Sequence, residues 1–179
     1  MTYNQPEDLR RKVQDAGQMF TSEELQSFLD EANTELETNI GRNYTEIKHN
    51  PKQEIRLRFG NLEKFNEIYK LPDTKIPEEK YDVEKGVIEF NETYYEEEIK
   101  NNKIKIFYEP KVFKTLELLY GARNILEITL QQTNDEVVGS QVKQIKNKIN
   151  MLENRLSDST SSVTTTTSGR PIRRKGKWR

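Results

Sequence analysis

The chain has 179 residues, a formal net charge of −1, 32% hydrophobic and 33% charged residues, which favours one polar domain whose surface faces partners and water. The absence of cysteine excludes a disulfide framework, a thiolate zinc site and a cysteine nucleophile. No apolar stretch is long enough to cross a bilayer, and residues 1–6 lack the basic start and apolar run of a signal peptide, so we expect a cytoplasmic protein.

The N-terminal part, residues 1–50, predicts two helices, over residues 7–16 and 22–40. Thr21 and Glu24 form a capping-box pattern, in which each side chain bonds the other residue's backbone N–H. Gly41 stands where a left-handed helix end needs glycine. The apolar residues of the longer helix share one face, and they are Leu25, Phe28, Leu29, Ala32, Leu36 and Ile40.

Residues 51–110 change from a helical period to alternation, which predicts a small antiparallel β lobe. Apolar residues alternate with other residues over Ile55–Phe59 and over Ile104–Tyr108, and each run predicts a strand. The sequence from Val83 to Phe90 predicts a hairpin around Glu84-Lys85-Gly86. Prolines at 51, 72, 77 and 110 indicate short strands. The lobe is inserted into a four-helix unit, so the predicted fold class is α+β and mostly α.

Residues 111–157 predict a pair of helices, the first over 111–132 and the second beginning near Asp135. The apolar positions of the second helix recur in steps of four and three, which gives a narrow heptad-like seam. Such a short seam packs against the preceding helix or against a neighbouring subunit. Its members are Val138, Val142, Ile145, Ile149, Leu152 and Leu156.

Few residues in the sequence indicate chemistry. His49 is the one histidine, and a polar loop around it favours an exposed residue over a catalytic or metal-binding one. The glycines form no phosphate-binding pattern. The densest acidic run, Glu96–Glu98, is interpreted as solvated surface in preference to a carboxylate pair. We therefore expect no enzyme, no cofactor, no metal site and no catalytic residue.

The C-terminal residues carry the most unusual pattern. Residues 158–169 are rich in serine and threonine and predict a linker. Residues 170–179 hold six of the 29 basic groups and no acid, so the preceding 169 residues set 23 basic groups against 30 acidic ones, a net charge of −7. The predicted docking tail consists of Arg170, Pro171, Ile172, Arg173, Arg174, Lys175, Lys177, Trp178 and Arg179.

Three interpretations of this tail compete: a solvated terminus, a segment that binds nucleic-acid phosphates, and a segment that binds an acidic groove of a protein partner. Trp178, Ile172 and Pro171 favour the protein partner, because aromatic and arginine residues are common interface anchors. Aromatic residues also stack on bases, so the nucleic-acid interpretation stays open.

The order of elements resembles the head–tail adaptor (connector) proteins of long-tailed phages and related archaeal viruses. The resemblance lies in Leu9–Val13, the break at Gly17, the start Phe20–Leu25 and the long helix that ends at Ile40-Gly41-Arg42; the later stretch Leu118–Arg123 is similar to the family's second long helix. The β lobe departs from the minimal, all-helical version of the family.

The resemblance implies a homo-oligomeric ring of about twelve copies under the portal protein, in the neck of the virion. The tail would dock on the portal, a stopper or tail-completion protein would follow, and DNA would pass through the lumen without sequence-specific binding. The resemblance implies no membrane and assembly in the host cytoplasm. The residues expected to pack within and between subunits are Leu25, Phe28, Leu29, Leu36, Val142, Ile145, Ile149 and Leu152.

Two other classes of function are weighed against the adaptor. A nucleic-acid-binding or genome-packaging accessory protein would use residues 170–179 on phosphates and would bind DNA in a strongly salt-dependent way. An enzyme using carboxylates alone would need two acids with shifted pKa values in one cleft. The adaptor ranks first and the enzyme last.

Overall fold

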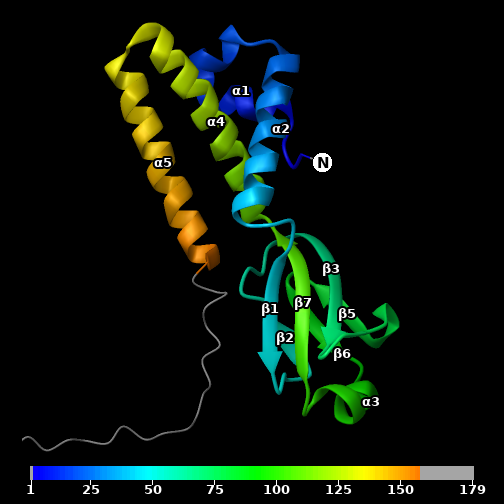
Figure 1. The fold of residues 1–179 in the computed structure, drawn as a ribbon. Helices are drawn as coiled ribbons and strands as arrows, with labels where there is room; N and C mark the ends of the chain where they lie inside the picture. Colours follow the sequence, from blue (N-terminus) through cyan, green and yellow to red (C-terminus); the bar gives the residue numbers. More distant parts are fainter. Residues whose placement is uncertain (1, 158–179) are drawn as a thin grey trace, which may run out of the picture.

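A computed structural model describes residues 2–157. Helices form one end of the molecule and two antiparallel sheets form the other, so the predicted α+β, mostly α class is confirmed (Figure 1). The four principal helices are α1 (Pro6–Val13), α2 (Ser22–Asn39), α4 (Val112–Thr133) and α5 (Glu136–Ser157).

Helix α4 is the central helix of the helical unit. It lies between α2 and α5 and contacts both, while α1 packs against α2 and α4 (Figure 1). The chain direction alternates, so that α2 and α5 run toward the β lobe and α4 runs away from it. The capping box of Thr21 and Glu24 is present at the start of α2, as predicted.

The β lobe contains two sheets. The larger sheet has the order β1-β7-β3-β4 and the smaller one β2-β6-β5, with antiparallel pairing throughout. The strands are β1 (Tyr44–His49), β2 (Glu54–Arg56), β3 (Leu62–Lys70), β4 (Thr74–Lys75), β5 (Tyr81–Glu84), β6 (Val87–Phe90) and β7 (Lys103–Pro110). A short helix, α3 (Glu92–Tyr94), continues as a π-helical turn over Tyr95–Ile99.

Two predicted boundaries are wrong. The lobe begins with β1 at Tyr44 instead of residue 51, because β1 pairs with β7 along its whole length and buries a carboxylate, Glu46, where alternation leads one to expect an apolar residue. The first helix ends at Val13 instead of residue 16. Gln14 there has a positive φ of 47°, and a 3-10 segment, Gln14–Met19, follows.

Of the other predicted elements, one strand is shorter than expected, and the hairpin and the two later helices are present. The run Ile55–Phe59 contributes only β2, which ends at Arg56. The hairpin is confirmed: β5 and β6 pair from Tyr81↔Phe90 to Glu84↔Val87. Positive φ values at Lys85 and Gly86 match the two-residue turns that join twisted strands. The helices predicted from 111 and 135 begin at Val112 and Glu136.

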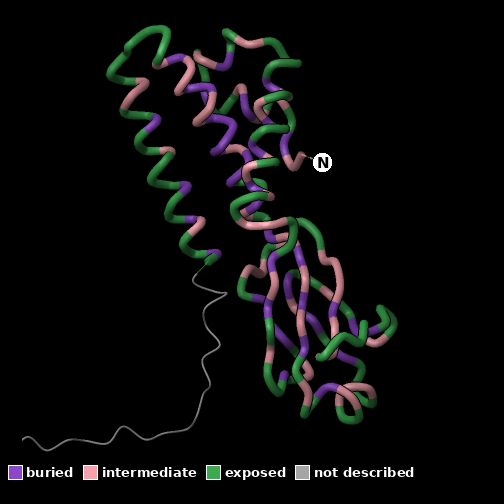
Figure 2. The backbone as a smooth tube through the Cα atoms, viewed as in Figure 1, coloured by how far each residue is buried: buried purple, intermediate pink, exposed green. Residues whose placement is uncertain are grey.

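A continuous apolar core joins the lobe to the helices. It includes residues of both sheets, the first half of α4 and the last half of α5, for example Ile106, Tyr108, Phe113, Leu116 and Ile149. Buried positions accordingly follow the chain across the junction (Figure 2). A second cluster lies farther up between α1, α2, α4 and α5. The lobe and the helical unit are therefore packed as one body.

The hairpin turn provides a test of the lobe. Gly86 has a φ of +78°, and a Cβ atom there would overlap the backbone of Gly60, whereas Gly41 has a φ of +98° with open space around it. Gly41→Ala should cost about 1–2 kcal/mol of unfolding free energy from backbone strain alone. Gly86→Ala should cost about 3 kcal/mol or more, since the clash adds to the strain.

Urea denaturation of both variants, followed by circular dichroism, measures the difference. Equal losses in the two variants would show that the close approach of Gly86 to Gly60 does not constrain the lobe.

Candidate partner-binding site

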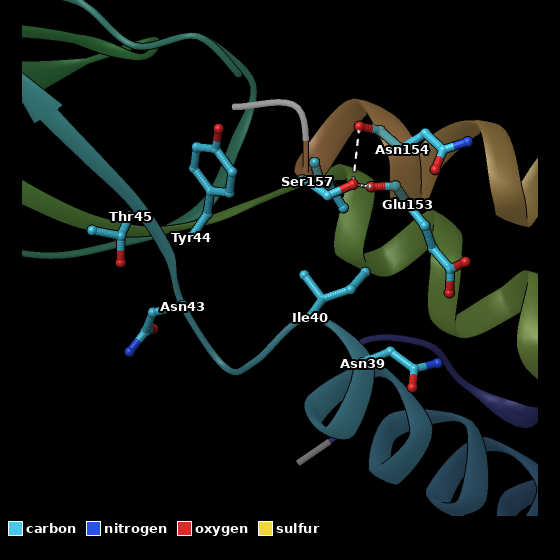
Figure 3. A pocket seen from close by; sticks show the side chains of 9 residues that line it. Asn39, Ile40, Asn43, Tyr44, Thr45, Glu153, Asn154 and Ser157 are labelled. Carbon is cyan, nitrogen blue, oxygen red and sulfur yellow. Dashed lines mark hydrogen bonds between the residues drawn. The ribbon is translucent and has the colours of Figure 1, made fainter. Parts of the chain in front are cut away.

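The candidate site is the junction between the helical unit and the lobe, where the last described helix ends. A cleft of about 690 Å³ opens there, and it is lined by the end of α2, the link to β1 and the last turns of α5 (Figure 3). The chain continues toward its C-terminus from the rim of this cleft, at Ser157. The lining residues are Asn39, Ile40, Asn43, Tyr44, Thr45, Glu153, Asn154, Leu156 and Ser157.

The α2 side of the cleft is shaped by a tight exit from the helix. Gly41 takes up a φ of +98°, and Arg42 turns back to form an ion pair with Glu37 at 3.0 Å. Tyr44 then enters the lobe core, where its ring packs edge-on against Phe59 and Tyr108. These contacts position the polar residues Asn43 and Thr45 on the cleft wall.

The α5 side is tied to α2 through Tyr120 of α4. The Tyr120 hydroxyl donates a hydrogen bond to Glu153 and accepts one from Asn39. Burial and the nearby Glu153 carboxylate raise the pKa of Tyr120, so the hydroxyl remains protonated at any ordinary pH. Ser157 closes the last turn by donating to the backbone oxygen of Glu153 at 2.9 Å (Figure 3).

A buried carboxylate organises the lobe beside the cleft. Glu46 of β1 accepts hydrogen bonds from the backbone N–H of Arg58, at 2.7 Å, and from the Tyr108 hydroxyl. Lys48 forms an ion pair with it at 2.6 Å. Burial, together with this carboxylate, raises the pKa of Tyr108. Buried and more exposed positions thus alternate along the start of β1 although one buried position holds the carboxylate of Glu46, because Arg58, Tyr108 and Lys48 provide its hydrogen bonds and its ion pair.

A second buried carboxylate holds the N-terminal segment. Glu117 of α4 is fully buried and accepts from the backbone N–H groups of Tyr3, at 2.9 Å, and Asn4, at 2.8 Å. The Asn4 side chain donates to it at 2.7 Å and to the carbonyl of Lys114 at 2.8 Å. Burial raises the pKa of Glu117, and these donors oppose the shift.

A paired charge links α2 and α4. The Arg123 guanidinium bonds both carboxylate oxygens of Glu35, at 2.9 and 2.5 Å, and lies over the Tyr120 ring at 5.4 Å from the ring centre. The hydrogen bond to Glu35 is the main cause that raises the pKa of Arg123. Bidentate geometry of this kind is more specific than a single ion pair.

The other candidate groups from the sequence lie apart from one another. His49 is exposed at the end of β1. Glu96 bonds Lys100 at 2.8 Å and Glu98 bonds Lys70 on the surface of the π-helical turn. Within residues 2–157, no three histidine or carboxylate side chains are close enough together to hold a metal ion. None of the helices described is both long and apolar enough to cross a membrane.

The predicted docking tail, residues 170–179, lies outside the described residues, as does the predicted linker. The residues predicted to pack subunits belong mainly to the core of the chain itself. Leu25, Leu29, Leu36, Val142, Ile149 and Leu152 are buried, and Phe28 and Ile145 are half-buried against the same core. The heptad-like seam therefore packs against the preceding helix, one of the two arrangements that its period allows.

Sequence reasoning did not find the cleft or the two buried carboxylates. Their partners are far apart along the chain: Glu117 bonds residues more than 110 positions away, and the cleft combines residues 39–45 with 153–157. No protein-family model matches the chain, and no curated protein is significantly similar to it.

Removing the Glu117 carboxylate should detach the N-terminal segment from α4. Glu117→Ala leaves buried N–H donors of Tyr3 and Asn4 without an acceptor, and we expect a loss of about 3 kcal/mol in unfolding free energy. Glu117→Gln keeps one acceptor oxygen and should lose less. Guanidinium denaturation measures both values.

Glu127→Ala is the matched control on the same helix. Glu127 is 36% exposed and pairs with Lys146 at 2.7 Å, and an exposed pair of this kind contributes less than about 1 kcal/mol. A loss for Glu117→Ala no larger than that of the control would mean that the N-terminal segment does not depend on the carboxylate.

Proposed function

We propose that the chain is a non-catalytic structural subunit of a virus neck, a head–tail adaptor that forms a ring of about twelve copies beneath the portal protein. The observation that carries the proposal is the arrangement of the ends. Helix α5 stops at the junction cleft, and a serine- and threonine-rich stretch and a basic, tryptophan-containing segment follow it in the sequence.

The chain beyond Ser157 is long enough to reach another protein. A linker of twelve residues, 158–169, spans at most about 40 Å when extended. It would deliver residues 170–179 to an acidic groove on the portal, where arginine pairs bidentately with carboxylates and Trp178 acts as an apolar anchor. Many such contacts acting together in one ring give high avidity.

The body of the subunit suits a channel wall. The shared core of lobe and helices makes a rigid spacer between a portal and the next component, a stopper or tail-completion protein. The net charge of −7 over residues 1–169 disfavours binding of DNA to the lumen wall, so that DNA slides past. The particle would assemble in the host cytoplasm and require no cofactor and no membrane.

A nucleic-acid-binding or packaging accessory protein is the second candidate. The clustering of Arg173, Arg174, Lys175 and Lys177 favours it, because such clusters release counterions from phosphates.

The two functions separate on co-expression with the portal protein of the same source. Native mass spectrometry and negative-stain images of the full chain should show a ring stacked on the portal, and a chain that ends at Gly169 should not bind. A monomer that ignores the portal and shifts labelled DNA would establish the second function instead.

Substitution inside the tail should abolish docking without loss of stability. We expect the triple variant Arg173→Ala, Arg174→Ala and Trp178→Ala to lose portal binding in a pull-down while its melting temperature stays within about 1 °C of the wild type, under the shift of about 2–4 °C that a 1 kcal/mol loss produces at this chain length. A large fall in melting temperature would contradict this account.

A charge-preserving variant serves as the matched control. Arg173→Lys with Arg174→Lys keeps the charge and removes the bidentate fork. Portal binding should weaken in this variant if carboxylates are the target. Salt-dependent DNA binding should be nearly unchanged, because lysine also neutralises phosphates.

A further inference from the structure

Helix α2 presents an acidic outer face. The helix carries six acidic residues and no basic one, and three of the six are engaged: Glu24 by Thr21 in the capping box, Glu35 by Arg123 and Glu37 by Arg42. Glu23, Asp30 and Glu31 are exposed, and no described cation pairs with them. We call these three residues, with the small Ser27 and Thr34 between them, the acidic face.

The acidic face is shallowly hollowed. A concavity of about 540 Å³ runs along α2 and is lined by Ser27, Asp30, Glu31, Thr34, Glu35, Thr38 and Asn39. Ser27 and Thr34 are seven residues apart and lie on one stripe, with Asp30 and Glu31 on either side of it. Small side chains along the middle allow another helix to approach closely.

Helix α5 presents the complementary surface. Lys148, Met151 and Arg155 follow one another at steps of three and four and share one stripe, and Lys148 and Arg155 have no ion-pair partner among residues 2–157. Met151 is 52% exposed and Val137, on the same stripe, is 65% exposed. Within the described chain only four large hydrophobic residues are so exposed, and two of them lie here. We call this stripe the basic face.

The helices that carry the two faces lie on opposite sides of α4, and they span about the same height. Helix α4 lies between α2 and α5, which run in the same direction (Figure 1). Their ends meet at the cleft, where Tyr120 bonds both Asn39 and Glu153. With a rise of about 1.5 Å per residue, counting back from these ends brings Lys148 within about one helical turn of Asp30 and Glu31.

We propose that the acidic face of α2 in one copy packs against the basic face of α5 in the next. Lys148 lies against Asp30 and Glu31, Met151 covers the small residues beside them, and Arg155, which is farther toward the lobe, adds to the positive charge of the basic face. Two different patches of one chain joined in this way form a heterologous contact, which closes into a ring when the rotation between copies permits. The inference rests on the ring of the proposed function and adds the surface that forms it.

Charge reversal tests the pairing of faces. One variant, Asp30→Lys with Glu31→Lys, has two basic faces, and another, Lys148→Glu with Arg155→Glu, has two acidic faces. Each variant alone should assemble about tenfold less than the wild type or worse, because like charges then meet at every contact. An equal mixture of the two should assemble again, since every contact can pair opposite charges.

The readout is native mass and negative-stain imaging, both with and without the portal protein. Asp82→Lys with Glu89→Lys makes the same change of charge on exposed residues of the lobe and should assemble normally. Circular dichroism melts establish that all variants fold.

Each outcome decides between the two proposals. A ring that forms on the portal in spite of either reversal overturns the pairing of faces and leaves the adaptor function intact. Oligomers that follow the charge rule but ignore the portal support the pairing and overturn the adaptor function. If assembly is lost in the lobe control as well, or the mixture does not recover, the acidic and basic faces are not the contact.

The chain's own tail is the competing occupant of the acidic face. In that case the Arg173→Ala, Arg174→Ala, Trp178→Ala variant would lose contact between copies, and Lys148→Glu with Arg155→Glu would not. Disulfide formation gives an independent measurement, because the chain has no cysteine. Asp30→Cys with Lys148→Cys should form a ladder of linked copies on oxidation and Asp30→Cys with Glu89→Cys should not; no ladder at high concentration overturns the pairing.

Discussion

The direct passage from β7 into α4 is the constraint on which the rest of the structure depends. Pro110 ends the strand and Val112 begins the helix, so one residue separates a central strand from the central helix. Tyr108 and Phe113, on either side of that step, are both fully buried in one cluster. Because no loop separates the two elements and the core continues across them, the lobe has no hinge about which to swing. Packing in the shared core therefore fixes the position of the lobe relative to the exposed faces of α2 and α5.

Two buried carboxylates secure the parts of the chain that this passage does not hold. Glu46 ties β1 to the loop after β2 through Arg58, and Glu117 ties the N-terminal segment to α4. Burying a charge is costly unless its hydrogen bonds are supplied, and at both sites backbone N–H groups supply them. A backbone N–H is present in every residue but proline, so a substitution of Arg58 or Asn4 by any other residue would not remove these donors. Each carboxylate therefore holds one segment of backbone in place. An apolar residue at either site would leave those donors unpaired.

The features that sequence predicted are those in which the determining residues are close together. The capping box needs only Thr21 and Glu24, the hairpin only Lys85 and Gly86 between alternating runs, and the long helices only their own period. Strand β1 was missed because Glu46 occupies an inward position, and its partner Tyr108 lies 62 residues away. The seam of α5 was ambiguous for a different reason. A stripe of apolar residues has the same period whether it faces its own chain or another one, so only the packing on α4 distinguishes the two. The junction cleft combines residues 39–45 with residues 153–157, which no local pattern links.

The separation of charge along the sequence becomes a separation in space because the body is rigid. Acids concentrate on α2, bases without an ion-pair partner among residues 2–157 lie on α5, and the last ten residues of the sequence are basic. Had α2 and α5 packed on each other, these charges would have neutralised one another within the chain. The insertion of α4 between them keeps them apart and leaves both faces to the surroundings. In the proposed contact, a long-range attraction would act between copies, while like charges would keep the wrong faces from meeting. Apolar area would have given a stronger contact, but Met151 and Val137 are too small a patch to hold two copies without the charges around them. An assembly held by charge would weaken as ionic strength rises. It would also form more readily when several copies are already close together, and the proposed docking tail would bring them together on one partner.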